Sequence, residues 1–277
     1  GRRPPRILGT TPGAPLRQPG ETGLDAAVRL VGALDRSHLP IQGPPGSGKT
    51  KLIAAITRAE TACGRRVLIA SGTNRAVDEA LSALLDEGLA DQILRLGSHR
   101  STTGRLTSHT LKELMAAEAS LDARVAAGAR SLRSRPIVGA TAATLMSGTY
   151  EEALETFDLV IVDESAQMKV PDTAGAIRLG RRALLIGDNY QLPPGVRTKS
   201  GSGGTPTEGS ADLSRSLFEL LLDRAGKDGA QELTRLEEQY RMNAEICRVP
   251  EEMWYGTLRP ANDVVALQRL VDCNGHM

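Results

Sequence analysis

The glycine-rich stretch at residues 43–50 constrains this chain more than any other feature. It reads Gly-Pro-Pro-Gly-Ser-Gly-Lys-Thr, which matches G-x-x-x-x-G-K-[ST] at every fixed position. The apolar run 38–42 before it predicts a buried strand, and residues 49–63 after it have the spacing of a helix. Glycines let the backbone fold round an anion without Cβ clashes, and a helix N-terminus supplies further N–H donors. The stretch therefore predicts a phosphate-binding loop between a strand and a helix.

The loop residues have separate expected tasks toward a nucleoside triphosphate. Lys49 would neutralise the β- and γ-phosphates, and the Thr50 hydroxyl would coordinate Mg²⁺. The alternative is a glycine-rich turn that only resembles such a loop, and the flanking strand and helix argue against it. The predicted nucleotide-binding residues are Gly43, Pro44, Pro45, Gly46, Ser47, Gly48, Lys49 and Thr50.

Two acids further along the chain complete the predicted site. Asp163 and Glu164 directly follow the apolar run 159–162, so both are expected at the carboxyl edge of a sheet, where α/β folds bind ligands. Asp163 would bind Mg²⁺, and Glu164 would orient and deprotonate the attacking water. Without the phosphate loop, this pair would be interpreted as a solvated strand end. Gln191 follows the next apolar run and could contact the γ-phosphate or the water, with an ordinary turn as the alternative.

Short apolar runs without alternation recur along the chain and predict parallel strands covered on both faces. Helical spacing between the runs fits right-handed crossovers, so we expect an α/β fold, a P-loop NTPase with a doubly wound parallel sheet. Residues 98–134 are polar and then Ala-rich, which predicts a surface insertion with one long helix. The other predicted strands are 66–70, 93–96, 137–140, 159–162 and 183–186. The other predicted helices are 24–34, 74–85 and 213–222, with a loop at 198–210 and a linker at 226–230.

Composition adds only weak constraints. The formal net charge of +1 gives no indication of nucleic-acid binding, although a local basic track would suffice for it. Cys63, Cys247 and Cys273 lack the spacing of a metal site, which indicates reduced thiols in a cytoplasmic protein. No apolar run approaches the roughly 20 residues needed to cross a bilayer, so we expect no membrane partner.

Six stretches of the chain, in this order, resemble the motifs of superfamily 1 helicases of the 5′→3′ branch, which includes the nonsense-mediated-decay helicase. Residues 163–167 fit the D-E-x-x-Q signature of that branch, and residues 239–243 are close to the form found in the replication nuclease–helicase. Residues 21–50 also resemble bacterial proteins that fuse a RecB-like nuclease to such a helicase. The six stretches are 43–50, 71–78, 162–167, 187–194, 216–220 and 239–242.

The resemblance implies ATP and Mg²⁺ as cofactors and gives roles to four further residues. Gln167 and Gln191 would couple the γ-phosphate to the rest of the motor, and Tyr240 would pack near the adenine or ribose. Arg241 would reach the γ-phosphate as an arginine finger, which stabilises charge in the transition state. The alternative for Arg241 is a surface ion pair of little energetic weight.

The resemblance also implies that two loops bind the nucleic-acid backbone. Hydroxyl and amide groups at helix N-termini suit phosphate contacts, which position a strand without reading its sequence. Simple N-capping by Thr73 or Thr141 is an equally good local explanation. The implied nucleic-acid-binding residues are Ser71, Thr73, Asn74, Arg75, Thr141 and Thr144.

The domain prediction follows the same resemblance. We expect a tail or linker at residues 1–20, a RecA-like ATP-binding domain at 21–228, and the incomplete start of a second RecA-like domain at 229–277. Leu24 stands where the family carries an adenine-reading glutamine, which leaves the preference for ATP open. The insertion at 98–134 could supply the family's helical stalk, but it is too short for its β-barrel as well. A nuclease domain would lie outside these residues.

The expected function is therefore that of an ATP-driven motor on single-stranded nucleic acid, DNA rather than RNA, moving 5′→3′. We expect weak activity from these 277 residues alone. The alternative is a P-loop ATPase that acts as a nucleotide-dependent switch or scaffold without unwinding, because many proteins share this fold and have other functions.

Overall fold

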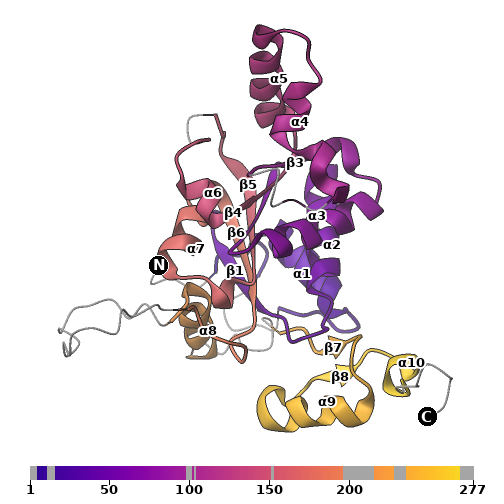
Figure 1. Ribbon diagram of the computed structural model, residues 1–277. Coiled ribbons are helices and arrows are strands. Elements are labelled where there is room, and N and C mark those ends of the chain that lie inside the picture. The colour runs from indigo at the N-terminus through magenta and orange to yellow at the C-terminus, as the bar shows by residue number, and fades with distance from the viewer. Residues whose placement is uncertain are drawn as a thin grey trace, which may run out of the picture.

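The computed structural model describes residues 5–10, 16–97, 102, 104–150, 153–195, 215–227 and 235–268. Within these residues, a parallel six-stranded sheet has the strand order β1-β6-β5-β2-β4-β3 (Figure 1). The predicted α/β class and the doubly wound parallel sheet are therefore confirmed. The strands are β1 (His38–Gln42), β2 (Val67–Ser71), β3 (Ile93–Arg95), β4 (Ile137–Thr141), β5 (Phe157–Asp163) and β6 (Gly180–Gly187).

Helices cover both faces of this sheet. On one face lie α1 (Gly23–Gly32), α2 (Lys49–Ala62) and α3 (Asn74–Asp86), and on the other lie α6 (Ala142–Met146) and α7 (Val170–Ile177) (Figure 1). The helix α8 (Leu217–Lys227) packs beside α7 and against β1 and β6. Because all strands run in one direction, the loops that leave their carboxyl ends meet at one edge of the sheet.

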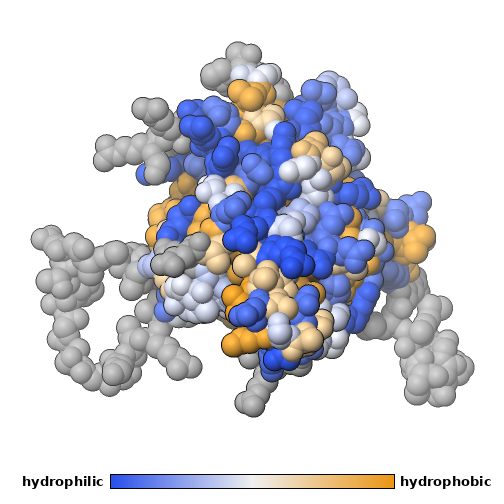
Figure 2. Space-filling view, turned by 90° about the horizontal axis from the view of Figure 1, so that it is seen from above, coloured by the Kyte–Doolittle hydropathy of each residue, from blue (hydrophilic) through white to orange (hydrophobic). Residues whose placement is uncertain are grey.

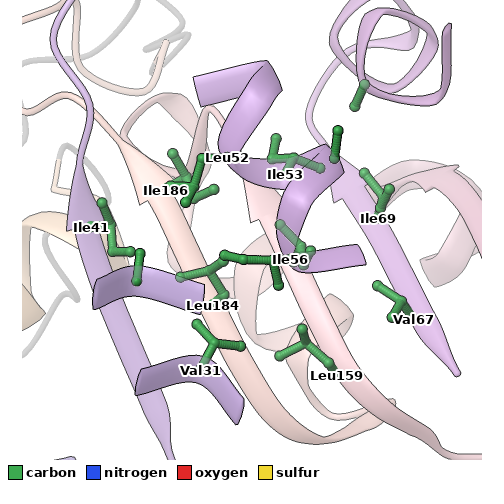
Figure 3. Packing of buried hydrophobic residues seen from close by; sticks show 14 of the residues in the cluster. Val31, Ile41, Leu52, Ile53, Ile56, Val67, Ile69, Leu159, Leu184 and Ile186 are labelled. Carbon is green, nitrogen blue, oxygen red and sulfur yellow. The ribbon is translucent and has the colours of Figure 1, made fainter. Parts of the chain in front are cut away.

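The core consists of apolar side chains that alternate along the strands. Ile69, Leu159 and Leu184 lie in one cluster with side chains of α1 and α2, and Figure 3 shows them beneath the α2 helix that carries Ile53 and Ile56. The intervening residues, such as Val160, point to the other face. Each fully buried residue of this size stabilises the fold by about 1.5–3 kcal/mol relative to exposure. Burial on both faces explains why the strands lack alternation in the sequence.

The range 98–134 differs from its prediction of one long helix, because its described residues contain two α-helices with a break between them. These are α4 (Leu111–Ala116) and α5 (Leu121–Ser134), and both project away from the sheet near β3 (Figure 1). The Ser120 hydroxyl accepts a hydrogen bond from the Ala123 N–H at 3.2 Å, which caps a new helix at this point. Leu121 and Val125 are 74% and 58% exposed, so they add no core between the insertion and the sheet.

Residues 1–20 were predicted to be a tail or linker, but their described part packs against the domain. The Leu8 N–H donates to the Ala33 carbonyl at 2.8 Å, and the Arg6 N–H donates to the Ser37 hydroxyl at 2.9 Å. Arg29 donates to the Leu16 carbonyl at 2.6 Å. These contacts attach the N-terminal residues to α1 and to the turn after it.

Residues 235–268 form a small second unit beside the phosphate loop. The strands β7 (Glu238–Gln239) and β8 (Arg259–Pro260) pair in parallel. The helix α9 (Ala244–Pro250) runs into the π-helical turn η6 (Glu251–Tyr255), and α10 (Asp263–Ala266) follows β8. The predicted loop at 198–210, most of the linker at 226–230, and Cys273 lie outside the described residues.

The surface view from above is largely hydrophilic, and its apolar residues form separate patches (Figure 2). Among the described helices, none is both long and apolar enough to cross a membrane.

Candidate functional site

The phosphate loop adopts a conformation that its glycines make accessible. Gly46 and Gly48 have φ values of +76° and +80°, in the left-handed region that side chains disfavour. A Cβ atom on Gly46 would also lie only 2.6 Å from the Cβ of Arg241. Gly48 directly precedes α2, and the Gly43 N–H donates to the Gly187 carbonyl at 2.8 Å. The loop is thus held at the carboxyl edge of the sheet, where α2 begins.

Lys49 and the two predicted acids lie together at this edge. The Lys49 Nζ atom is 3.6 Å from the Glu164 Oε1 atom, and it donates to the Gly43 carbonyl at 3.1 Å. Glu164 has a φ of +51°, which is uncommon for a residue other than glycine. Its N–H donates to the Asp163 Oδ1 atom at 2.9 Å. Residues that are more than 110 positions apart in the chain therefore share one polar site.

Asp163 is buried in this site, and its surroundings change its acidity. Burial, and to a smaller degree the negative charge of Glu164, raise the pKa of Asp163 to about 7, although the Glu164 N–H and the charge of Lys49 act in the opposite direction. A cation next to the carboxyl would favour its charged form. Oxygen ligands of this kind are those that Mg²⁺ prefers.

Two buried polar atoms of the site have no hydrogen-bond partner among the described residues, the Ser47 Oγ and the Glu164 Oε2. Buried polar atoms in folded proteins normally have partners, so this polar space fits a ligand. A triphosphate with Mg²⁺ suits it, because Ser47 and the loop N–H groups would bind phosphates. Thr50 and Asp163 would then be the protein ligands of the metal.

The second unit contacts the phosphate loop through the residues that the motif at 239–243 predicted. The Tyr240 N–H donates to the Gly46 carbonyl at 2.9 Å, which explains the close approach of Arg241 to the same glycine. The Lys51 Nζ atom lies 4.7 Å from the centre of the Tyr240 ring, a cation–π contact. Arg241 itself is exposed. Lys51 was not among the predicted site residues, because it stands one residue beyond the phosphate-loop pattern.

Gln167 and Gln191 also lie side by side. The Gln167 Nε2 atom donates to the Gln191 Oε1 atom at 3.5 Å, and the Gln191 Nε2 atom donates to the Asp188 Oδ2 atom at 3.0 Å. Asp188 is buried, and its Oδ2 atom also accepts from the Tyr255 hydroxyl at 2.6 Å. Tyr255 belongs to the second unit, so Asp188 connects the predicted γ-phosphate sensor to that unit.

An open cleft of about 380 Å³ lies beside these glutamines. It is lined by Gln167, Tyr190, Gln191, Leu192 and Pro193. Leu192 is 82% exposed at its rim. The Tyr190 ring packs edge-on against the Tyr255 ring with 5.2 Å between the centres, so the second unit also supports this wall.

The six residues proposed for nucleic-acid contact lie at the ends of β2 and β4, two adjacent strands, or directly after them. Thr73 and Thr141 cap α3 and α6, since their hydroxyls accept from the Ala76 and Thr144 N–H groups. The capping alternative is therefore observed, and it leaves the remaining N–H groups of each helix end available.

The other members of this set differ in exposure. Ser71 is fully buried, so its hydroxyl does not face solvent. Arg75 is exposed and pairs with Glu79 at 2.7 Å. Asn74 is half-buried at the first position of α3.

Comparison with known proteins adds independent information on the chain. Residues 25–133 and 116–199 match the family model described as AAA domain. The DNA replication ATP-dependent helicase/nuclease DNA2 of Mus musculus is 32% identical over 245 residues, which covers 86% of this chain and 21% of that protein. The ATP-dependent helicase NAM7 of Saccharomyces cerevisiae is 30% identical over 266 residues, covering 86% and 26%. The structure of an arterivirus nonstructural protein 10 helicase with DNA aligns with a TM-score of 0.49 at 15% identity, covering 88% of this chain and 45% of that chain.

The matched region includes the phosphate loop, the acid pair and Gln191. This chain spans about a quarter or less of the length of either curated relative. Both relatives are eukaryotic, so the resemblance to bacterial nuclease–helicase fusions stays a prediction. The matching family model, together with the motifs and the relatives that share them, shows that this chain belongs to the AAA domain family and to the superfamily 1 helicases.

Proposed function

We propose that this chain carries the ATP-hydrolysing motor of a helicase that moves along a single strand of nucleic acid. One observation carries the proposal. Lys49 and Glu164 lie 3.6 Å apart beside the buried Asp163, and Arg241 from a separate unit packs against the same phosphate loop. A phosphate loop alone serves many functions, but a contribution from a second unit is what a motor needs if nucleotide binding is to change how two units sit together.

The residues of the site would divide the work of hydrolysis. Lys49 and the loop N–H groups would bind the phosphates, and Mg²⁺, when bound, would neutralise part of their charge. The Glu164 Oε2 atom is buried and has no hydrogen-bond partner in the described part of the chain, so it can accept a proton from the attacking water. Gln191 would orient that water, and Arg241 would supply positive charge where negative charge develops.

The residues at the start of α3 and α6, next to the carboxyl ends of β2 and β4, are the proposed contact surface for the strand. Their N–H groups and the side chains of Asn74 and Thr144 suit phosphate oxygens, and such contacts would not read sequence. We further propose DNA as the substrate and 5′→3′ as the direction. The name of the DNA2 relative, which includes DNA replication, supports the first, and the D-E-x-x-Q residues at 163–167 support the second.

Two more features belong to the proposal. The DNA2 relative is named a helicase/nuclease, which supports a nuclease domain elsewhere in the same protein. Cys63 and Cys247 are free thiols, which suits a reducing compartment such as the cytoplasm.

The second candidate is a nucleotide-dependent switch without strand movement, and ATPase kinetics separate it from the motor. The test measures turnover of ATP by the full-length protein with no strand, with single-stranded DNA and with RNA of equal length. A motor hydrolyses ATP several-fold faster on a strand, and a duplex with a 5′ overhang is then unwound faster than one with a 3′ overhang. If neither strand changes the rate, the protein is a switch and not a motor.

A further inference from the structure

Arg95 is the largest fully buried polar side chain in the described part of the chain, with 1% exposure at the end of β3. Its Nε atom donates to the Asp78 Oδ1 atom at 2.7 Å, and its Nη2 atom donates to the Asn74 Oδ1 atom at 2.8 Å. Its Nη1 atom donates to the Leu96 carbonyl. A buried charge is costly to a protein unless it is paired and hydrogen-bonded, and here one guanidinium satisfies three acceptors.

These contacts fix how the Asn74 amide is oriented. A guanidinium has donors and no acceptor, so Asn74 must present its Oδ1 atom to Arg95. The Nδ2 group is then turned the other way, and it donates to no described residue. The outcome is a neutral N–H₂ donor held at the first turn of α3, beside the N–H groups of that helix end.

Arg95 also lies under the neighbouring loop. A Cβ atom built on Gly97 would be 3.4 Å from both the Arg95 Nη1 atom and the Thr144 hydroxyl. The loops after β2, β3 and β4 therefore converge on one buried cation. Asn74 and Thr144 belong to α3 and α6, the two helices whose first residues the proposed strand surface uses.

We infer that Arg95 is a positioning residue for strand binding, because it holds the Asn74 amide with its N–H₂ group toward a phosphate oxygen of the nucleic-acid backbone. This inference rests on the proposed function, since it needs a strand on that surface. Arg95 itself does not touch the strand, because it is buried.

Substitution of Arg95 by lysine tests this role. Lysine keeps the positive charge beside Asp78, but its single nitrogen cannot serve Asp78 and Asn74 at the same time, as the forked guanidinium does. In full-length protein, Arg95→Lys should weaken binding of a single-stranded DNA oligonucleotide about ten-fold, the effect of losing one hydrogen bond to a charged group. ATP turnover without a strand should stay unchanged.

The matched control is Arg182→Lys. Arg182 lies near the start of β6, is 8% exposed, and forms a buried ion pair with Glu60, far from the carboxyl edge of the sheet. The Arg182→Lys variant should lose stability, as the Arg95→Lys variant does, but it should bind the oligonucleotide with the affinity of the wild type. Equal loss of affinity in both variants would mean that Arg95 has only a structural role.

A double-mutant cycle and a salt titration sharpen the test. Asn74→Ala should weaken binding by the same factor as Arg95→Lys, and the combined variant should be no weaker than either, because both remove one contact. The slope of log K against log salt should be unchanged in all of them, since a neutral amide displaces no counterion. A slope reduced by about 0.7–0.9 in Arg95→Met with Asp78→Asn, which removes the guanidinium charge, would show a direct phosphate contact instead and would overturn the inference.

Two outcomes distinguish the inference from the proposed function. If the wild type binds no strand, the proposed function fails. If it binds but Arg95→Lys binds equally well, only the inference fails. Should Arg95→Lys not fold, Arg95→Met with Asp78→Asn removes both buried charges, and the same loss of affinity is expected from it.

Discussion

Glu164 combines a left-handed backbone with a carboxylate oxygen that has no partner among the described residues. This conformation is costly for glutamate, of order 1–3 kcal/mol, and it turns the side chain toward Lys49. We predict that Glu164→Gln lowers ATP turnover by about 10²–10⁴-fold, because the variant lacks the general base. ATP affinity should stay similar, because the substitution removes no contact with the phosphates. Steady-state kinetics and a nucleotide titration check this, with Glu155→Gln, an exposed glutamate, as the control. Unchanged turnover in Glu164→Gln would contradict the role.

Asp163 makes the stability of the metal-free protein depend on pH. The pKa of Asp163 is about 7 in the folded protein, against about 3.9 for a free aspartate. Between these two pH values, Asp163 is therefore protonated in the folded state and ionised in the unfolded state. The resulting stabilisation is complete below about pH 4 and is lost as pH rises through 7, at most about 4 kcal/mol. Urea unfolding without Mg²⁺ at pH 5 and pH 8 should therefore show a larger fall in stability for the wild type than for Asp163→Asn. Parallel pH profiles of the two proteins would refute this.

At the residue scale, sequence predicted the positions that belong to a spaced pattern. Lys49, Asp163 and Glu164 are recognisable because their neighbours form a strand, a turn or a helix of known geometry. Arg95 is not, because a single polar residue at a strand end shows nothing of its partner, and Asp188 lies in the stretch 187–194 but received no predicted role for the same reason. Arg95 meets Asp78 and Asn74 only through the packing of α3 on the sheet.

At the scale of elements, the loop after β6 is held by the turn η6 of the second unit. The buried Asp188 accepts from Tyr255 and from Gln191, so removing one donor leaves a buried carboxylate less satisfied. We predict that Tyr255→Phe destabilises the protein by about 1–3 kcal/mol and slows ATP turnover, because Gln191 loses a fixed neighbour. Denaturant unfolding and kinetics check this, with Tyr150→Phe as the control on a partly buried tyrosine away from the site. Equal stability of the two variants would argue against the connection.

The elements that sequence missed share a physical cause. The break between α4 and α5 depends on one capping serine, Ser120, within a run that is otherwise helical in spacing. Likewise, residues 5–10 and 16–20 contain no periodic pattern, because Ile7 and Leu16 pack against the core as single apolar residues and the other contacts are hydrogen bonds of the backbone and of Arg29. Such contacts leave no trace in hydrophobic spacing.

At the scale of the whole molecule, Arg241 depends on how the second unit sits against the sheet. Its backbone is fixed at Gly46, while its side chain is exposed at the edge of the phosphate loop. We predict that Arg241→Ala lowers strand-stimulated ATP turnover by about 10³–10⁵-fold in full-length protein, with little change in ATP affinity. Arg248→Ala, on the exposed face of α9, is the control. A loss of affinity without a loss of maximal turnover would place Arg241 in nucleotide binding and not in charge stabilisation.

The most direct test of the central claim, that the loop at residues 43–50 and the acid pair form one Mg²⁺–triphosphate site, is an equilibrium titration of ATP with Mg²⁺. Lys49→Ala should bind ATP at least about ten-fold more weakly than the wild type, since it removes the cation that faces the phosphates. Lys112→Ala, which changes an exposed lysine on α4, should bind as the wild type does. Equal ATP affinity in Lys49→Ala and the wild type would contradict the site.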